Sequence, residues 1–416
     1  MTLSITTDRQ LIRAASRSNR YLLLSFTAPR APRPENHRPV NVAFVLDRSG
    51  SMSGESKFRL ARQAVEQSLR MLRPDDRFSL VVYDDRVDVL ARSVNATTAA
   101  IRQALDSLSA IDPRGSTDLC AGWMRGCEQV AEFVGEEKTS RVLLLTDGLA
   151  NHGVTDRDTL ARHASELRQR GVATSTFGVG TDFDERLLRD MAHEGGGNFY
   201  FLETAQQIPD LITSELGEAL EVVFPQTAIE IDMPRRAEGE VLNRFRSSLV
   251  DNVLRIDIGD VVSDQEVEVL VRVNFPEGET GARVPTQARV ISRSAEAIYS
   301  ANIEWTYATH ADNDRQARNL DVDRKVAEIY ASRARADATE ANRNHNFEAA
   351  RSVIERTAAR IREYAGNDPV LNDCWNGLMA EQPRYVQEMS PVTMKQSYFA
   401  EEMAMKGRTV GGKARR

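Results

Sequence analysis

Short apolar runs alternate with amphipathic stretches of helical length between residues 39 and 222. The runs VAFVL and VLLL are almost wholly apolar, as in strands buried on both faces. Strands are expected at Asn41–Leu46, Phe78–Tyr83, Val87–Arg92, Arg141–Thr146, Val172–Val179 and Asn198–Phe201. Apolar residues at i, i+3 and i+4 predict helices over Lys57–Leu72, Thr98–Leu108, Leu119–Val134, Asp156–Arg170, Glu185–His193 and Ala205–Leu220. This alternation predicts an α/β domain with a doubly wound, mostly parallel, six-stranded sheet, whose Val87 strand is an antiparallel edge after the turn at Asp84 and Asp85.

After residue 222 the apolar positions alternate with polar ones and no helical stretch intervenes. The period of two predicts an antiparallel β-sandwich over residues 223–310, with segments such as TAIEIDM, NVLRIDIG and EVEVLVRVNF as strands. Tyr21–Phe26 also has the pattern of a strand and precedes a Pro-rich segment. Because the ends of a compact domain usually lie close together, we expect the α/β domain (39–222) to be an insertion in a sandwich that residues 1–38 complete.

The pattern becomes helical over residues 311–416. Leu320–Asn342 and Phe347–Tyr364 flank a polar turn and predict a helical hairpin, and Pro383–Lys406 predicts a third, weaker helix. The alanine-rich stripe of the second helix indicates a packing seam rather than a cofactor site. We expect the basic end of the chain to be a solvated tail; its cationic residues are Lys406, Arg408, Lys413, Arg415 and Arg416.

Composition narrows the functional classes. The 416 residues carry a formal net charge of −7, with 41% hydrophobic and 28% charged residues, values typical of soluble globular proteins with two or three domains. The absence of a concentrated basic surface argues against nucleic acid as a partner. Neither a signal peptide nor a membrane helix is expected, so a cytoplasmic location is predicted. The three cysteines, Cys120, Cys127 and Cys374, show no metal-type spacing and are expected to be buried thiols.

Three predicted loops carry short side chains with oxygen atoms. Asp47, Ser49 and Ser51 alternate directly after the first buried strand, Thr117 precedes a helix, and Asp147 follows the fourth strand. Ligands of open α/β sheets bind outside the carboxyl ends of the strands, where these loops are expected to meet. An Asp-x-Ser-x-Ser string alone is usually a helix cap or turn, so the combination of loops carries the inference.

These segments, VAFVLDRSGSMSG, RGSTDL, LLLTDG and GVGTDFDERLL, resemble the successive landmarks of a von Willebrand factor type A domain of bacterial type. The chain is similar in this region to the A domains of proteins like the calcium-activated chloride-channel proteins and the inter-alpha-trypsin inhibitor heavy chains. The resemblance covers about Pro39 to Val222. It implies a metal-ion-dependent adhesion site formed by Asp47, Ser49, Ser51, Thr117 and Asp147.

The all-oxygen ligand set implied by the resemblance suits a hard cation. Mg²⁺ is the expected ion, with Mn²⁺ or Ca²⁺ as alternatives. Three of the five groups are neutral hydroxyls, so the metal charge is incompletely offset, and we expect an Asp or Glu of a protein partner to complete the shell. Residues near the metal loops that we expect to form a rim for that partner are Arg48, Met52, Arg114, Leu149, Asn151 and His152.

Three classes of function fit these features. The favoured one is a metal-dependent protein-interaction module or scaffold without catalytic activity. The others are a subunit that acts with an AAA+ ATPase in complex remodelling or metal insertion, and a surface-adhesion or channel-associated subunit. A hydrolase with His152 as base is disfavoured, because a lone loop histidine is more often a surface residue. The sequence identifies neither the partner nor the oligomeric state.

Overall fold

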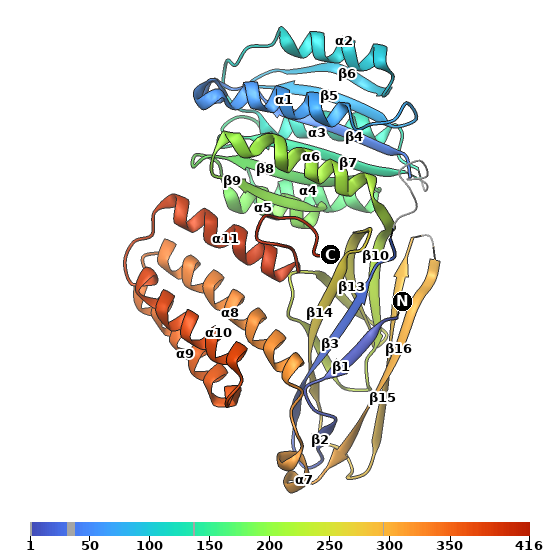
Figure 1. Cartoon of the computed structure of the whole chain (residues 1–416), viewed down its shortest axis with the longest axis vertical. Helices are drawn as coiled ribbons and strands as arrows, with labels where there is room; N and C mark the ends of the chain where they lie inside the picture. Colours follow the sequence, from blue (N-terminus) through green and yellow to red (C-terminus); the bar gives the residue numbers. More distant parts are fainter. Residues whose placement is uncertain (1, 31–37, 136–137, 294) are drawn as a thin grey trace. The chain divides into compact units, whose positions relative to one another are not determined.

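The computed structural model describes residues 2–30, 38–135, 138–293 and 295–416, and the chain divides into two compact units (Figure 1). The first, here called the α/β unit, comprises Ala31–Val222. The second, the sandwich unit, combines Met1–Arg30 with Val223–Arg416. The α/β unit is therefore inserted between two segments of the sandwich unit in the sequence.

The α/β unit contains one six-stranded sheet with the order β6-β5-β4-β7-β8-β9. Its strands are β4 (Val40–Asp47), β5 (Arg77–Tyr83), β6 (Val87–Asn95), β7 (Thr139–Thr146), β8 (Ala173–Val179) and β9 (Gly196–Leu202). β4 pairs in parallel with both β5 and β7, and β6 is antiparallel to β5 at the sheet edge. The predicted doubly wound sheet and its antiparallel edge strand are thus confirmed.

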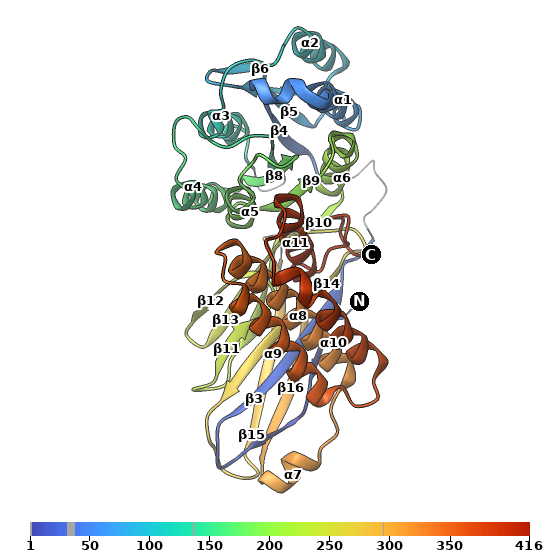
Figure 2. The same cartoon turned by 90° about the vertical axis from the view of Figure 1, so that its left-hand side faces the viewer.

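Helices cover both faces of this sheet, as Figure 2 shows. They are α1 (Lys57–Leu69), α2 (Thr98–Ser109), α3 (Leu119–Ala131), α4 (Arg157–Gln169), α5 (Glu185–Glu194) and α6 (Ile208–Leu220), with short 3-10 segments η2 (Gly50–Ser56) and η3 (Ala205–Gln207). α1 and α6 pack together on one face, whereas α3, α4 and α5 cover the other. Every residue of β4 and β7 is consequently buried, which explains their continuous apolar runs.

Two sheets form the core of the sandwich unit, and the N-terminal strands belong to both. The first has the order β1-β3-β14-β11 and the second the order β12-β13-β10-β15-β16-β2. Their strands are β1 (Ser4–Thr7), β2 (Leu11–Arg13), β3 (Ser18–Thr27), β10 (Val222–Asp232), β11 (Glu238–Val241), β12 (Arg246–Val250), β13 (Val253–Val262), β14 (Glu266–Phe275), β15 (Arg283–Ser292) and β16 (Ala295–Ala308). Side chains such as Leu24, Val269 and Trp305 fill the core.

The sandwich unit differs from the prediction at its margins. β2 pairs in parallel with β16, so the second sheet is not wholly antiparallel. β11 and β12 are short and lack alternating burial, and the period-two pattern therefore gave no signal for them. Leu23 and Leu270 point out of the four-stranded sheet and contact Val326 and Ile329 of a helix, which explains why both faces of β3 are apolar.

The helical region contains α7 (His310–Arg315), α8 (Leu320–Arg343), α9 (Phe347–Ala365), α10 (Pro369–Glu381), η4 (Gln382–Tyr385) and α11 (Pro391–Met405). α8 and α9 form the predicted hairpin. The prediction of one helix over Pro383–Lys406 is wrong, because a new helix begins at Pro391 with Ser390 as its cap. α10 was not predicted, although Asp368 caps it and Pro369 occupies its first turn.

The basic end of the chain is partly packed, so the expectation of a solvated tail is wrong for Arg408 but not for the exposed Lys413 and Arg416. Arg408 is buried, and its Nε atom donates to the carbonyl of Gly412 over 2.7 Å. The carbonyl of Arg415 accepts a hydrogen bond of 2.9 Å from the amide of Glu266, at the start of β14. Backbone and side-chain hydrogen bonds therefore hold this segment, and Arg415 pairs with Glu328 of α8, whereas Lys413 and Arg416 remain exposed.

Two expectations from composition can be compared with the described residues. Cys120 and Cys127 are free and buried within α3, whereas Cys374 is free and only half-buried, so the prediction of three buried thiols is wrong for Cys374. Across the parts of the chain that the structure describes, no helix combines the length and the apolar character needed to cross a membrane.

Candidate metal centre

Three loops meet at the carboxyl ends of β4 and β7, the two central strands. Asp47 is the last residue of β4, and Asp147 directly follows the last residue of β7. The amide of Gly50, in the first loop, donates to the carbonyl of Gly115 over 3.2 Å and so joins the loop that carries Thr117. The chain continues from β4 toward one side of the sheet and reaches β7 from the other, which leaves the crevice that binds ligands in open α/β sheets.

A continuous series of hydrogen bonds connects four of the five predicted ligands. Asp47 Oδ1 accepts the Ser49 amide over 2.7 Å, and the Ser49 and Ser51 hydroxyls lie 3.1 Å apart. Ser51 Oγ then donates to Asp147 Oδ1 over 2.6 Å. The alternation of the motif thus places the three side chains of the first loop on one side of that loop, facing Asp147.

Thr117, the fifth predicted ligand, lies next to these hydrogen-bonded residues, beside Gly148. A Cβ atom at Gly148 would lie 3.5 Å from Thr117 Oγ1 and 3.7 Å from Ser51 Oγ. The loop of Thr117 is in turn held by Asn151, whose Oδ1 accepts the Thr117 amide over 3.1 Å. The structure therefore brings all five sequence-predicted residues together.

The two carboxylates of the site are fully buried and differ in their partners. Burial raises the pKa of Asp47 to about 6, against hydrogen bonds from Thr146 and Ser49 that lower it, and Asp147 adds a further rise. Asp147 is bound by Lys57, whose Nζ atom lies 2.7 Å from Asp147 Oδ2. A divalent cation beside Asp47 would supply the positive charge that this carboxylate lacks.

A buried phenol gives an independent test of whether the site suits a metal with bound water. Tyr83, the last residue of β5, is fully buried, and its hydroxyl has no hydrogen-bond partner among the described residues. The Thr146 hydroxyl is close enough to affect the pKa of Tyr83, but it does not reach hydrogen-bond geometry with the phenol and donates over 2.6 Å to Asp47. A buried polar atom without a partner is costly, and an ordered water of a hydrated ion would satisfy it.

The donor set also indicates which kind of ion fits. No group of three or more His, Cys, Asp and Glu side chains within the described ranges is arranged to hold a metal. An ion at this site would depend on the hydroxyls of Ser49, Ser51 and Thr117 together with Asp47 and Asp147. Hard oxygen ligands of this kind fit Mg²⁺ or Mn²⁺ and disfavour a soft ion.

Two of the six predicted rim residues cannot contact a partner. Met52 is fully buried, because the 3-10 turn that follows Ser49 points it into the interior. Arg48 is buried too, and its guanidinium lies 3.0 Å from Asp84 and 2.6 Å from Asp88. Arg48 and Met52 alternate with the hydroxyl residues of the loop, so they face away from the site. Their buried side chains stabilise the loop from the interior of the α/β unit.

The other four rim residues, Arg114, Leu149, Asn151 and His152, are exposed on the loops around the site. Arg114 Nε lies 2.8 Å from Asp84, and Leu149 is 55% exposed. His152 Nδ1 lies 3.1 Å from Asp118, which also caps α3. Sequence reasoning missed Lys57, Tyr83 and Thr146; only Thr146, next to Asp147, could have been suspected from its position.

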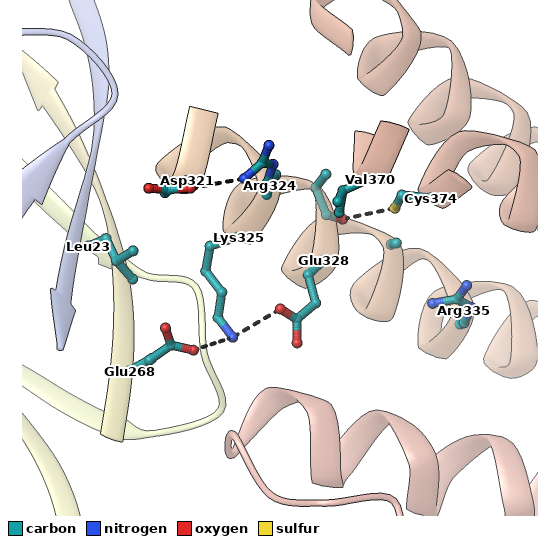
Figure 3. Close-up of a pocket in the computed structure, with 11 residues that line it drawn as sticks. Leu23, Glu268, Asp321, Arg324, Lys325, Glu328, Arg335, Val370 and Cys374 are labelled. Carbon is teal, nitrogen blue, oxygen red and sulfur yellow. Dashed lines mark hydrogen bonds and ion pairs between the residues drawn. The ribbon is translucent and has the colours of Figure 1, made fainter. Parts of the chain in front are cut away.

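The sandwich unit contains a cavity of about 560 Å³, which is a second candidate site (Figure 3). Lys325 is its most buried charged residue, and its ammonium lies 2.8 Å from Glu268 and 3.0 Å from Glu328. The remaining charged residues of the lining, Asp321, Arg324 and Arg335, also have partners of opposite charge. Since these charges are already neutralised by the chain itself, we assign the cavity no ligand.

Comparison with known proteins supports the α/β unit as a recognised domain: residues 41–214 match the model of the von Willebrand factor type A domain. Uncharacterized protein YfbK of Escherichia coli is 27% identical over 243 residues, 56% of this chain and 42% of its own length. Human inter-alpha-trypsin inhibitor heavy chain H1 is 32% identical over 173 residues, 40% of this chain and 19% of its own, so this chain spans less than half of either relative. The solved von Willebrand factor type A protein of Catenulispora acidiphila shares the fold over 100% of this chain and 97% of its own, with a TM-score of 0.72 and 15% identity. Residues 41–214, with their five oxygen-bearing residues at the strand ends, are a von Willebrand factor type A domain.

Proposed function

We propose that this chain captures an acidic side chain of a protein partner through a divalent metal ion held at the α/β unit. The observation that carries the proposal is the meeting of Asp47, Ser49, Ser51, Thr117 and Asp147 around one crevice at the strand ends. Von Willebrand factor type A domains typically mediate protein–protein interaction through a metal-dependent site of this kind.

The charge balance of the site favours an external carboxylate. Asp47 and Asp147 contribute two negative charges, and Lys57 already neutralises part of that charge at Asp147. The three hydroxyls are neutral, so a divalent ion keeps a net positive charge among the protein ligands. A partner Asp or Glu would offset this charge in a partly desolvated place, where charge-assisted contacts are strongest.

Mg²⁺ is the proposed ion, because it binds few protein oxygens and retains several of its waters. The unpartnered hydroxyl of Tyr83 supports an ion that carries water into the site. Mn²⁺ has the same preferred geometry and serves as a spectroscopic substitute in tests.

The proposal is tested by partner capture from lysate of the native cell, with the immobilised full chain. Partners should be retained in MgCl₂, released by EDTA and identified in the eluate. Thr117→Ala removes one proposed ligand and should abolish capture. Ser116→Ala removes a neighbouring exposed hydroxyl that makes no described contact with the site, and should leave capture unchanged.

Titration calorimetry with MgCl₂ alone gives a second readout that does not depend on the partner. The wild-type chain and Ser116→Ala should bind one equivalent of metal, and Asp47→Ala should bind none. Capture that survives both EDTA and Asp47→Ala would overturn the proposal, because the partner would then be recognised without the metal.

A further inference from the structure

Lys57 occupies an unfavourable position unless it serves the metal site. It is the first residue of α1, where the positive end of the helix dipole repels a cation. The two residues before it, Glu55 and Ser56, both have left-handed backbones with φ of 49° and 61°, which side chains of their type rarely adopt. The ion pair of Lys57 with Asp147 is an interaction that can offset this free-energy cost.

The side chain of Lys57 is enclosed at the edge of the site. It is 14% exposed, and its ammonium makes a 2.7 Å ion pair with the fully buried Asp147. The same Nζ atom would lie 3.9 Å from a Cβ placed on Gly180, in the loop after β8. The ammonium is thus held among the metal loops, and Asp147 is the anion that offsets the costs of its position.

Asp147 divides its two oxygens between the motif and this lysine. Oδ1 accepts the hydroxyl of Ser51, and Oδ2 accepts the ammonium of Lys57. A divalent ion that binds beside Ser51 therefore shares Asp147 with a charge of the same sign. Like charges that share one carboxylate repel each other strongly, because a site this buried screens them poorly.

We propose that Lys57 is a tethered monovalent cation that competes with the divalent metal for Asp147 and thereby lowers the metal affinity of the site. The inference rests on the proposed function, since it concerns the same metal. Two consequences follow for Lys57. Without metal, its ammonium neutralises the buried Asp147 carboxylate and so stabilises the fold. With metal, the weakened affinity makes occupancy of the site depend on the divalent-ion concentration around the protein.

The test compares metal affinity in Lys57→Met and Lys57→Arg with that of the wild-type full chain. Methionine keeps the length of the aliphatic stem and removes the charge, whereas arginine retains the charge. Lys138→Met removes the same charge from the loop before β7, at the opposite end of the strands, and is the matched control. Titrations with MnCl₂, followed by calorimetry and by electron paramagnetic resonance of the free ion, are run at pH 8 to keep carboxylates ionised.

Loss of the competing charge should tighten Mn²⁺ binding by about tenfold or more in Lys57→Met. Lys57→Arg and Lys138→Met should stay within about threefold of wild type. Unchanged or weaker binding in Lys57→Met would overturn the inference and make Lys57 a residue that positions Asp147. If the wild-type chain and Lys57→Met both fail to bind Mn²⁺, the proposed function falls as well, whereas failure of Lys57→Met alone leaves that function standing.

A thermal readout keeps the test decisive if Lys57→Met is less stable. Without metal, the variant leaves the buried Asp147 carboxylate without its cation, so its melting temperature in EDTA should fall. Because added Mn²⁺ replaces the missing charge, the metal-induced rise in melting temperature should exceed that of the wild type. A rise equal to or smaller than that of the wild type would contradict competition.

Discussion

The two ends of the sheet in the α/β unit each bury a carboxylate, but they neutralise it to different degrees. At the amino ends of the strands, Glu215 of α6 accepts four hydrogen bonds. Its donors are Arg141 at 2.6 Å, Ser175 at 2.6 Å, Asn198 at 3.0 Å and Tyr200 at 2.6 Å. The buried guanidinium of Arg141 supplies a full positive charge, so the chain itself neutralises this carboxylate.

At the carboxyl ends, Asp47 is equally buried but accepts hydrogen bonds from neutral groups, the amide and hydroxyl of Ser49 and the hydroxyl of Thr146. Within the described residues no ion pair joins Asp47 to a cation, and burial accordingly raises its pKa to about 6. A carboxylate that holds a helix in place needs all its partners from the chain. A carboxylate that binds a metal must keep a negative charge that the chain does not neutralise. This difference separates the structural end of the sheet from the binding end.

The largest expected effect is at the structural end. Glu215→Gln leaves Arg141 buried without its counter-ion and turns an amide toward the donating Asn198. Breaking a buried ion pair costs about 3–5 kcal/mol, which should lower the melting temperature by about 10 °C in a unit of this size. Differential scanning calorimetry checks this, and a melting temperature within 2 °C of wild type, taken as roughly 1 kcal/mol or less, would contradict the completed network.

Metal binding should produce the next largest change. At a Mg²⁺ concentration of about 100 times the dissociation constant, the folded state gains about 2.7 kcal/mol. Calorimetric scans in MgCl₂ and EDTA should show this shift in the wild type and in Glu215→Gln, because the latter leaves the binding end intact. A shift that persists in Asp47→Asn would place the stabilising ion elsewhere on the protein.

Asp47→Asn should have the opposite sign to Glu215→Gln in the absence of metal. The neutral amide removes the cost of keeping a poorly neutralised charge buried, and the rise in the pKa of Asp47 from 3.8 to about 6 corresponds to about 3 kcal/mol. The melting temperature in EDTA should therefore rise at neutral pH, although the amide also needs Thr146 to rotate its hydroxyl.

The pH dependence of that gain gives its control. Because the folded-state pKa of Asp47 is about 6, above the ordinary value of 3.8, the wild type loses stability as the pH rises between these values. The difference between Asp47→Asn and wild type in EDTA should be small near pH 4 and complete above about pH 6. A gain of equal size at both pH values would show that the charge of Asp47 is not its cause.

The sequence predicted the binding end better than the structural end, for a physical reason. Short oxygen-bearing side chains directly after apolar runs mark strand-end loops, so Asp47 and Asp147 could be located without coordinates. Glu215 has a local signal in the sequence: it follows Leu211 and Ile212 by four and three residues, which places a glutamate on the apolar face of α6. The donors that stabilise the buried Glu215 carboxylate come from three different strands, and no local sequence pattern predicts them.

Orientation within the first loop was the least predictable feature. Arg48 and Met52 stand next to the hydroxyl residues in the sequence, yet both are buried, Arg48 directly after β4 and Met52 within the 3-10 turn. Lys57 reaches Asp147 from the start of α1, directly after two left-handed residues that no sequence pattern predicts. Proximity in sequence therefore identified the loops of the site, whereas the direction of each side chain required the fold.

The smallest expected effect on stability belongs to the exposed rim, where a substitution should separate binding from folding. Leu149 is 55% exposed, so Leu149→Ser should change the free energy of unfolding by no more than about 0.5 kcal/mol. Loss of its apolar contact should nevertheless weaken partner capture about three- to tenfold, because apolar residues beside a charged contact exclude water from it. Leu320→Ser, at the 45% exposed first residue of α8, is the matched control and should capture the partner normally. Capture by Leu149→Ser at the wild-type level would contradict this prediction. Recognition would then depend on the metal and the polar loop residues, and the apolar rim would not contribute to the binding end of the sheet.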